Sequence, residues 1–394
     1  MGIETPSFIM IYILTLLLVA TDMVPMSVAA LIGALLSVWI GLSYGVFSYD
    51  EAAGFINMRL IGLLVGTMIV MEVAYRSGLF RFVALYTIKV AGGDPRKLFI
   101  LICITSATVS MFLSDSTALL LIAAAATTMS KIMDYDPVPY FVSASVMVNL
   151  GGTSTLIGSV SNMVIGLASG LSFTDFISYL APCELALWVL TTAVLYYLYK
   201  PRLAQKREVP TYNPWEGVEN KTAFRRAALL LGLFFVLFIF QDYLNLKPEA
   251  VALGCAVLAL AVSGFDPSGI LRNIDWETIF FLGGFFFIVG GLEKTGILNE
   301  VGQAIVGLNE NSSFFLASIT LWLSGLASTI VSNIAVALTF TPIIQALNIA
   351  NPAPMWSALV LGSNLGGAAT PMSGVVTVMA LGALKKEGIK FSLA

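Results

Sequence analysis

The stretch VMVNLGGTSTLIGSVSN (146–162) decides how this chain is interpreted, because Gly, Ser, Thr and Asn follow one another directly behind apolar residues. A second version of its centre, NLGGAAT, occurs at 364–370. Inside a bilayer, non-helical backbone is tolerated only where protein buries it or a wet cavity adjoins it, and glycine lets a solute approach such backbone closely. The two stretches are therefore predicted to be polar loops inside a membrane protein. Close packing of small residues where helices cross is the alternative interpretation.

The composition of the whole chain agrees with a membrane protein. Of its 394 residues, 58% are hydrophobic and 11% are charged, whereas soluble domains carry about 25% charged residues. The net charge of −3 gives no reason to expect nucleic acid as a partner. Histidine, the commonest metal ligand and proton shuttle, does not occur in the sequence. No cofactor is expected, and any proton coupling would have to use carboxylates.

Apolar runs occur along the whole chain, and a spanning helix needs about 20 such residues. The long runs cover 7–20, 25–42, 59–75, 98–113, 174–198, 227–245, 249–264, 277–291 and 314–331. Shorter and interrupted runs cover 117–130, 138–148, 163–170, 334–348, 355–362 and 373–384. Short runs broken by Gly, Ser, Asn or Pro are typical of re-entrant hairpins and broken helices. The predicted fold class is thus an all-α, multi-pass integral membrane protein.

A polar stretch at 199–226 divides the chain, and its basic excess predicts a cytoplasmic loop. Sequence blocks on one side of it recur in the same order on the other side. The pairs are 27–41 with 249–264, 63–80 with 281–298, 112–121 with 330–339, and 149–155 with 364–370. Such order is typical of repeat-built transporters. We expect a first repeat with a connecting helix at 1–198 and a second repeat at 227–394.

The charges indicate that the two repeats have inverted topology. The segment 76–97 is rich in Arg and Lys, whereas its counterpart at 292–313 is mainly acidic. By the positive-inside rule, the basic segment lies on the cytoplasmic side and the acidic one on the other side. Equivalent segments on opposite faces mean inverted repeats. Accidental charge on ordinary surface helices is the alternative.

Each half also has a short polar break at the end of an apolar run, at 114–117 and at 332–333. Asp115 is the most informative residue there, because an ionisable group within a hydrophobic region is costly and usually functional. Its counterpart is Asn333, so that one half could titrate or bind a cation where the other only forms hydrogen bonds. The alternative is an interfacial Asp115 that caps the following helix.

Two further observations concern charge. Glu72 is expected to pair with Arg76 one helical turn later, which favours a structural role for this carboxylate. The polar breaks and Gly-rich stretches contain no Lys or Arg. An anion bound there would rely on helix dipoles, hydroxyls, amides and co-bound cations.

Two longer stretches carry a family resemblance. DPVPYFVSASVMVNLGGTSTLIGSVSN (136–162) resembles the pattern of ArsB-type arsenite permeases and NhaD-type sodium/proton antiporters. VSNIAVALTFTPII (331–344) resembles a block in the second half of divalent anion/sodium symporters. Over roughly 25–390, the chain resembles the ion transporter superfamily, which contains these families and the citrate transporter group.

The resemblance implies a scaffold domain, a mobile transport domain with elevator-type alternating access, and often a homodimer. Together with the polar breaks and Gly-rich stretches, it assigns substrate or ion binding to Ser114, Asp115, Ser116, Asn149, Gly151, Gly152, Thr153, Thr155, Asn162, Ser332, Asn333, Asn364, Gly366, Gly367 and Thr370. A candidate sodium site would use Ser114, Asp115, Asn149 and Gly151.

Several positions depart from the relatives' pattern. Val160 and Ser161 stand where relatives have Pro-Pro, and Ile334 stands where the symporters have Thr. The loss of that Thr weakens a sodium/dicarboxylate interpretation, whereas Asp115 fits the ArsB and NhaD branches, which carry an acidic residue in this region.

The first hypothesis is therefore a secondary active transporter of the plasma membrane. It would be ArsB-like, carrying arsenite, antimonite or a related small anion with H⁺ or Na⁺ coupling. An NhaD-type sodium/proton antiporter and a sodium-coupled dicarboxylate or citrate transporter are the alternatives within the same fold. A channel is disfavoured by the repeats with broken helices. An intramembrane enzyme is disfavoured because no nucleophile–base pair is evident in the sequence.

Overall fold

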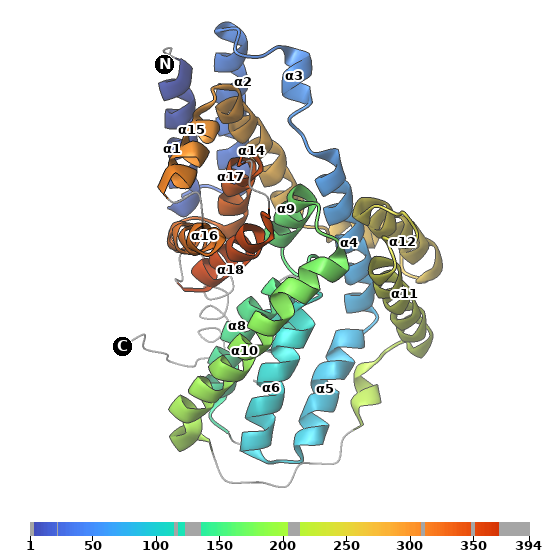
Figure 1. Ribbon diagram of the computed structural model, residues 1–394. Helices are drawn as coiled ribbons and strands as arrows, with labels where there is room; N and C mark the ends of the chain where they lie inside the picture. The colour runs from blue at the N-terminus through green and yellow to red at the C-terminus, as the bar shows by residue number, and fades with distance from the viewer. Residues whose placement is uncertain are drawn as a thin grey trace. The chain divides into compact units, whose positions relative to one another are not determined.

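The structure is a computed structural model that describes residues 4–21, 23–113, 117–122, 135–203, 213–308, 312–347 and 351–369, and its regular elements are helices (Figure 1). The α-helices of the first half are α1 (Glu4–Ala20), α2 (Met26–Ser43), α3 (Tyr49–Ala53), α4 (Met58–Arg76), α5 (Leu79–Ala91), α6 (Pro95–Ser110), α8 (Pro137–Thr153), α9 (Val160–Ser169) and α10 (Phe173–Tyr199). Residues 117–122 are also helical.

Two short 3₁₀ helices, η1 (Lys200–Arg202) and η2 (Pro214–Gly217), follow α10. The α-helices of the second half are α11 (Lys221–Ile239), α12 (Pro248–Val262), α13 (Pro267–Arg272), α14 (Trp276–Lys294), α15 (Ile297–Leu308), α16 (Ser313–Ser328), α17 (Asn333–Gln345) and α18 (Ala353–Ala369). The element α11 begins inside the stretch 199–226 that was expected to be a loop. Its start is fixed by Asn220, whose side chain accepts hydrogen bonds from the backbone of Thr222 and Ala223.

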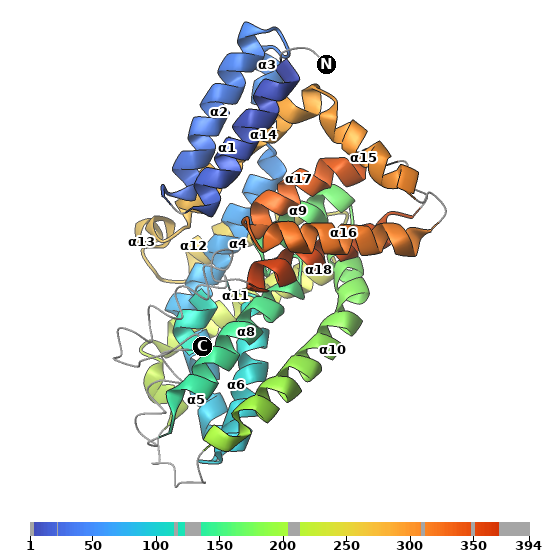
Figure 2. The same ribbon diagram turned by 90° about the vertical axis from the view of Figure 1, so that its left-hand side faces the viewer.

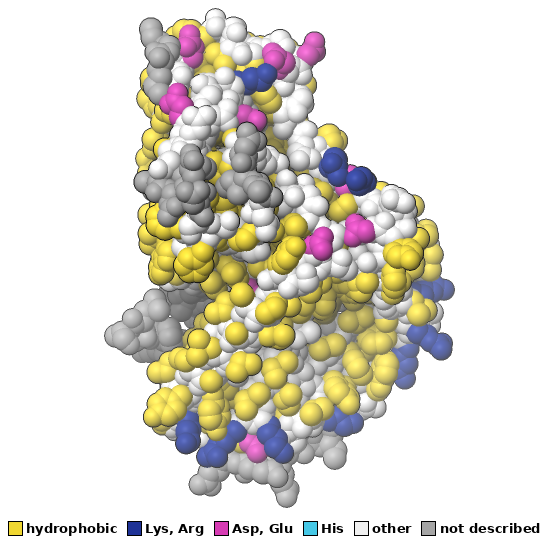
Figure 3. Space-filling view, in the orientation of Figure 1, with side chains coloured by type: hydrophobic (Ala, Val, Ile, Leu, Met, Phe, Trp, Pro, Cys, Tyr) yellow, Lys and Arg dark blue, Asp and Glu magenta, His cyan; other side chains and the backbone are white. Residues whose placement is uncertain are grey.

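Several helices can cross a bilayer. In the described part of the chain, five are long and apolar enough: Met26–Ser43, Tyr49–Arg76, Phe173–Arg202, Lys221–Ile239 and Trp276–Lys294. Their outward side chains are apolar, as with Leu185, Val189 and Leu190 on α10. Hydrophobic side chains cover the region where α10 lies on the face shown in Figure 3. The protein is thus an all-helical, multi-pass membrane protein, as the sequence predicts.

The chain divides into two compact units that draw on both halves of the sequence. Of the described residues, unit 1 contains those within 4–62, 160–171 and 275–369, and unit 2 contains those within 63–159 and 172–274. Unit 1 therefore holds α1, α2, α3, α9 and α14 to α18. Most of α4, together with α5, α6, α8 and α10 to α13, belongs to unit 2.

Two helix groups form unit 1. The first joins α1, α2 and α14, where Ser37 Oγ donates to the Phe287 carbonyl at 3.0 Å. A Cβ on Gly284 of α14 would lie 2.7 Å from the Ala30 carbonyl carbon of α2, so the two backbones nearly touch. The second group, α9, α16, α17 and α18, is drawn together in both Figure 1 and Figure 2. Close packing of small residues is the usual way to bring helices together in lipid.

Unit 2 repeats this arrangement with the halves exchanged. A Cβ on Gly66 of α4 would lie 2.5 Å from the Ala252 carbonyl carbon of α12. Thus α4 of the first half packs on α12 of the second, just as α14 of the second half packs on α2 of the first. Gly78 before α5 and Gly296 before α15 both have φ of 80°, a left-handed conformation that favours glycine. The sequence repeat is therefore matched by the order, packing and turns of the helices.

Candidate functional site

A cluster of buried amides lies in unit 1, where α9, α17 and α18 meet. We call Ser161, Asn162, Asn333 and Asn364 the amide cluster. Asn364 Nδ2 donates to Asn162 Oδ1 at 2.8 Å. Asn364 Oδ1 accepts from Ser161 Oγ at 3.3 Å and from Asn333 Nδ2 at 3.4 Å. Three residues that the sequence proposed separately, from both halves of the chain, are thereby brought into one network.

The positions of these side chains follow from the helices that carry them. Asn364 lies on the buried face of α18, and its Nδ2 also donates to the Val360 carbonyl one turn earlier at 2.8 Å. Asn162 is 0% exposed and Asn364 is 7% exposed. A polar group buried this deeply must be hydrogen-bonded to avoid a large desolvation cost. The cluster therefore holds the three helices together through hydrogen bonds between their side chains.

Two helix N-termini converge on the amide cluster. Ser161 and Asn162 lie in the first turn of α9, and Asn333 is the first residue of α17. Ser332 precedes it as the N-cap residue, in an extended conformation and without a side-chain cap hydrogen bond. Since helix N-termini carry partial positive charge and free N–H groups, this corner favours carboxylate or hydroxyl oxygens.

The end of α18 closes the other side of the cluster. A Cβ on Gly367 would lie 3.6 Å from Asn333 Cβ, so that the last turn of α18 lies against the start of α17. Ser328 Oγ donates to the Ser363 carbonyl at 2.5 Å and ties α16 to the same helix. A side chain on Gly366 would overlap the Gly325 backbone of α16. These close contacts hold α18 against α16 and α17 on this side of the amide cluster.

The first Gly-rich stretch lies in unit 2 and contains a helix break. The element α8 ends at Thr153, the backbone from Ser154 to Ser159 is not regular helix, and α9 begins at Val160. Residues 154–158 are all buried. Thr155 Oγ1 donates to the Met111 carbonyl just beyond α6 at 2.7 Å. Buried irregular backbone of this kind is the expected form of a broken transporter helix.

The loop prediction is wrong, however, for the Asn-Leu-Gly-Gly segments themselves. Residues 149–153 form the last turns of α8, and 364–369 form the last turns of α18. Within α8, Asn149 Nδ2 donates to the Ser145 carbonyl and Thr153 Oγ1 donates to the Asn149 carbonyl, both at 3.3 Å. A side chain on Gly151 would overlap the Ala107 backbone of α6. These glycines allow helices to cross closely, and the helix break comes after them in the sequence. Gly152 packs against the backbone of the break, since a Cβ on Gly158 would lie 2.6 Å from the Gly152 carbonyl oxygen.

Comparison with known proteins decides the family. The citrate transporter profile, CitMHS, matches residues 16–362. This chain belongs to the CitMHS citrate transporter family. Its predicted membership of the ion transporter superfamily is confirmed, and it is a secondary transporter rather than an enzyme.

Similar proteins extend this CitMHS assignment over nearly the whole chain. A 46 kDa membrane protein of Mycobacterium leprae is 30% identical over 98% of this chain and 92% of its own length. An uncharacterized transporter of Mycobacterium tuberculosis is 30% identical, over 95% of this chain and 90% of its own. Magnetosome protein MamN of Magnetospirillum gryphiswaldense is 25% identical, over 86% and 79% of the two chains.

The fold of this CitMHS protein also matches a solved transporter. The YdaH transporter of Alcanivorax borkumensis superimposes with a TM-score of 0.64 over 98% of this chain and 92% of that chain. Its sequence identity is 17%, so the likeness concerns the fold alone. It confirms an all-helical membrane architecture with several apolar spans.

Some predicted site residues lie outside the part of the chain that the structure describes. They are Ser114, Asp115, Ser116 and Thr370. The candidate sodium site is therefore described only at Asn149 and Gly151. Among the described residues, no group of three or more Cys, Asp or Glu side chains could hold a metal ion. The roles assigned to Asp115 and to the sodium site remain predictions for this CitMHS protein.

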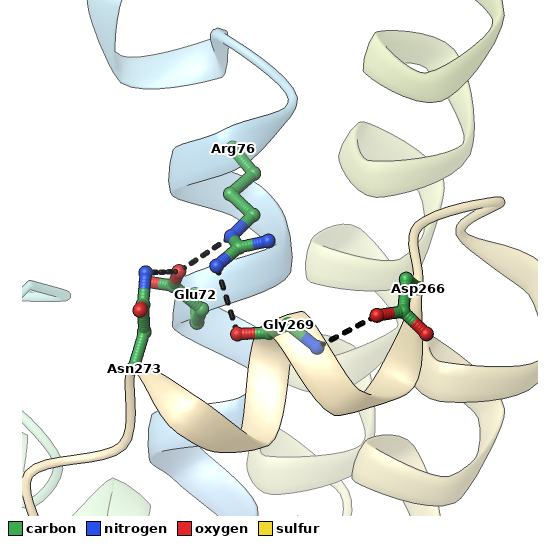
Figure 4. A network of polar contacts seen from close by, with 5 residues as sticks. All are labelled: Glu72, Arg76, Asp266, Gly269 and Asn273. Carbon is green, nitrogen blue, oxygen red and sulfur yellow. Dashed lines mark hydrogen bonds and ion pairs between the residues drawn. The ribbon is translucent and has the colours of Figure 1, made fainter.

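The Glu72–Arg76 pair is present and has a structural role (Figure 4). Arg76 Nε lies 2.7 Å from Glu72 Oε1, which also accepts from Asn273 Nδ2 at 2.8 Å. The Arg76 guanidinium donates to the Gly269 carbonyl at 2.8 Å, and the backbone N–H of Gly269 donates to Asp266 Oδ2 at 3.1 Å. The network ties α4 to α13 within unit 2, so Glu72 is not available as a coupling group.

Glu184, for which the sequence predicts no role, lies on the buried face of α10. The signal that could have found it is a single carboxylate near the middle of a long apolar helix. Hydropathy alone does not separate its buried face from its lipid face, because both are apolar.

Proposed function

We propose that this CitMHS protein is a cation-coupled carrier of a small carboxylate of the citrate class, and that the amide cluster binds the solute. The observation that carries the proposal is the meeting of three asparagine side chains from both halves of the chain at two helix N-termini. Amides and backbone N–H groups recognise carboxylate and hydroxyl oxygens without a fixed charge. The family assignment supports citrate in particular.

Charge balance limits how such a solute can bind. The cluster offers amides and a hydroxyl, and the Gly-rich stretches and polar breaks of the sequence contain no Lys or Arg. A multiply charged carboxylate would be costly to bury without compensation. The solute would therefore travel with cations, either as a metal complex or with coupled H⁺ or Na⁺.

Binding would exchange existing hydrogen bonds for new ones. The bonds from Asn364 to Ser161 and Asn333 are 3.3 and 3.4 Å long, near the limit for such contacts. A solute carboxylate oxygen can accept from the two donors, Ser161 Oγ and Asn333 Nδ2, while a hydroxyl or protonated carboxyl of the solute donates to the Asn364 Oδ1 that they leave. This exchange lets the cluster stay closed in the empty carrier and open to its solute without leaving buried polar atoms unpaired.

The proposed transport cycle is alternating access by an elevator movement of a transport domain against a scaffold. The repeat of helix order supports two related halves, and the charges of α5 and α15 support their inversion. Arg81 and Lys89 lie on α5, whereas Glu300 lies on α15. With the basic side inside, the 199–226 region would be cytoplasmic. We further propose a homodimer in the plasma membrane.

A second candidate solute is arsenite, the first hypothesis from the sequence. Arsenite in its uncharged hydroxide form would need no compensating cation, and this matches the lack of cationic side chains in the cluster. The NhaD-type alternative depends on Asp115 as the coupling carboxylate. The family profile favours the carboxylate, so arsenite is tested as a competitor.

The test is uptake into proteoliposomes that contain the full chain. Labelled citrate is supplied with and without Mg²⁺ and with and without a pH or Na⁺ gradient, and unlabelled succinate or arsenite is added as a competitor. The proposal predicts saturable, gradient-dependent citrate uptake whose KM rises strongly in Asn364→Ala. Uptake of arsenite but not citrate would establish the second candidate. Sodium flux without any uptake of citrate or arsenite would refute both.

A further inference from the structure

One ionisable side chain lies buried in a spanning helix outside the amide cluster. Glu184 belongs to the buried stripe of α10, which recurs every three to four residues along its first half. The members of this stripe are Phe173, Phe176, Leu180, Glu184 and, further on, Leu195. Glu184 is 2% exposed, whereas Leu185 and Val189 beside it are 59% and 72% exposed. The carboxyl therefore points into the protein and away from lipid.

Among the described residues, the polar group near this carboxyl is the indole N–H of Trp188, and the two form no well-aligned hydrogen bond. Both oxygens of the carboxyl are buried and unpaired. Trp188, one turn later on the same helix, has a buried Nε1 that is equally unpaired. Ser154 at the start of the helix break carries a further unpaired buried atom, its Oγ. Buried polar groups without partners are rare, and each calls for an explanation.

Packing places Glu184 at the depth of the helix break. Phe99 of α6 contacts both Tyr140 of α8 and Tyr196 of α10, with ring centroids 6.2 and 6.0 Å apart. Further along, Thr192 Oγ1 of α10 lies 3.8 Å from the sulfur of Met147. From the Phe99 contacts to the Thr192 contact, residue numbers rise from 140 to 147 on α8 and fall from 196 to 192 on α10. The two helices are therefore antiparallel.

The helical rise then fixes the level of the carboxyl. From Thr192 back to Glu184 the axis advances about 12 Å. The same advance along α8 from Met147 passes Thr153, where α8 ends, and reaches the break at 154–159. Glu184 therefore lies level with the irregular backbone that Thr155 ties to the end of α6.

No charged group of the described neighbours lies at this level. The elements packed against α10 are α6, α8, α11 and η1. The ionisable side chains of these elements lie nearer to the ends of the helices than Glu184 does, or at a different depth. They are Arg96, Lys97 and Cys103 on α6, Tyr140 on α8 and Asp136 at the N-cap of α8, Lys221, Arg225 and Arg226 on α11, and Lys200 and Arg202 on η1. The charged residues of α11 lie at its N-terminal end, whereas its C-terminal end contacts α10. There the ring centroids of Phe238 and Phe173 are 5.3 Å apart. Asp115, Lys131 and Asp134 lie outside the described residues.

We propose that Glu184 is a proton-carrying group of the transport cycle, at the level of the α8–α9 break. An isolated carboxylate at this place would be strongly disfavoured, so the group is a neutral acid in the arrangement described here. When the cycle admits water to the break, the acid loses its proton to water and becomes a carboxylate. It takes a proton back before it is buried again, and no other bond changes. The inference rests on the proposed carrier function, but Glu184 can be tested separately from the solute.

The first measurement needs no solute. Infrared difference spectra of the reconstituted full chain are recorded against pH, and the C=O stretch of a protonated carboxylic acid is followed. Glu184→Gln should remove one titrating band, which Glu184→Asp should restore at a shifted position. Glu219→Gln, at an exposed carboxylate, serves as the control and should leave this band unchanged. Spectra in which Glu184→Gln removes no titrating band would overturn the proposal.

The second measurement separates coupling from binding. In proteoliposomes, pH-gradient-driven uptake of labelled citrate should fall about tenfold or more in Glu184→Gln, a typical loss for one coupling interaction. Citrate exchange at equal pH on both sides should be kept, which a misfolded variant could not do. Undiminished pH-driven uptake in this variant would refute the coupling role. If the wild-type chain transports no citrate, the proposed function fails, while the infrared result still decides the protonation of Glu184.

Discussion

Asn364→Ala is the sharpest perturbation of the amide cluster. It removes the 2.8 Å bond to Asn162 and the two longer bonds to Ser161 and Asn333. A good neutral hydrogen bond contributes about 1 kcal/mol net, and each longer one about half of that. The sum is about 2 kcal/mol, equivalent to about a 30-fold change in an equilibrium constant.

The expected result follows from the exchange of these bonds with the solute. Citrate binding should weaken by about 30-fold, because the lost side chain can no longer hydrogen-bond the solute. Isothermal titration calorimetry with Mg²⁺–citrate on detergent-purified protein measures the Kd, and uptake measures KM. Ser363→Ala is the matched control: it is buried on the same helix, and its hydroxyl bonds only within α18, to the Val360 carbonyl. A wild-type Kd in Asn364→Ala would remove the cluster from the binding site.

Three further predictions concern the scaffold of the site. Gly366→Val should abolish folded protein, judged by size-exclusion chromatography, because the new side chain would overlap the α16 backbone, whereas Gly232→Ala, with open space around it, should be tolerated. Glu72→Gln should lower the free energy of unfolding by about 1–3 kcal/mol in denaturant titrations, since the partly buried Arg76 loses its charge partner. The citrate Kd should stay unchanged, and a changed Kd would contradict a structural role for Glu72. Thr155→Val removes the bond to the end of α6 and should slow citrate exchange with little change in thermal stability; an unchanged exchange rate would show that this tie does not matter to the cycle.

The sequence predicts the helices well because membrane-spanning helices can be identified from the length of their apolar runs. The run expected at 174–198 is α10, and the run at 25–42 is α2. The block repeat also anticipates the paired glycines Gly66 and Gly284, which bring helix backbones together in both units. In each case the local composition already contains the information.

The wrong loop prediction and the overlooked Glu184 have different physical causes. Gly151 and Gly366 were expected in loops, because glycine is permissive and the sequence does not show what lies opposite. The opposing backbones of Ala107 and Gly325 come from tertiary packing, which makes these glycines crossing points of continuous helices. Glu184 was overlooked because lipid and protein interior are equally apolar, so that a membrane helix shows no polar face from which to infer its inward side.

The reciprocal pairing of α2 with α14 and of α4 with α12 has a consequence for biosynthesis. Each of these contacts joins segments that leave the ribosome far apart in time. At typical rates of synthesis, α4 waits on the order of ten seconds or more for α12. During that interval its Gly66 face lies against lipid or the insertion machinery. Neither half can complete its own packing alone, so truncation between the halves should give two incompletely packed fragments that become stable only when produced together.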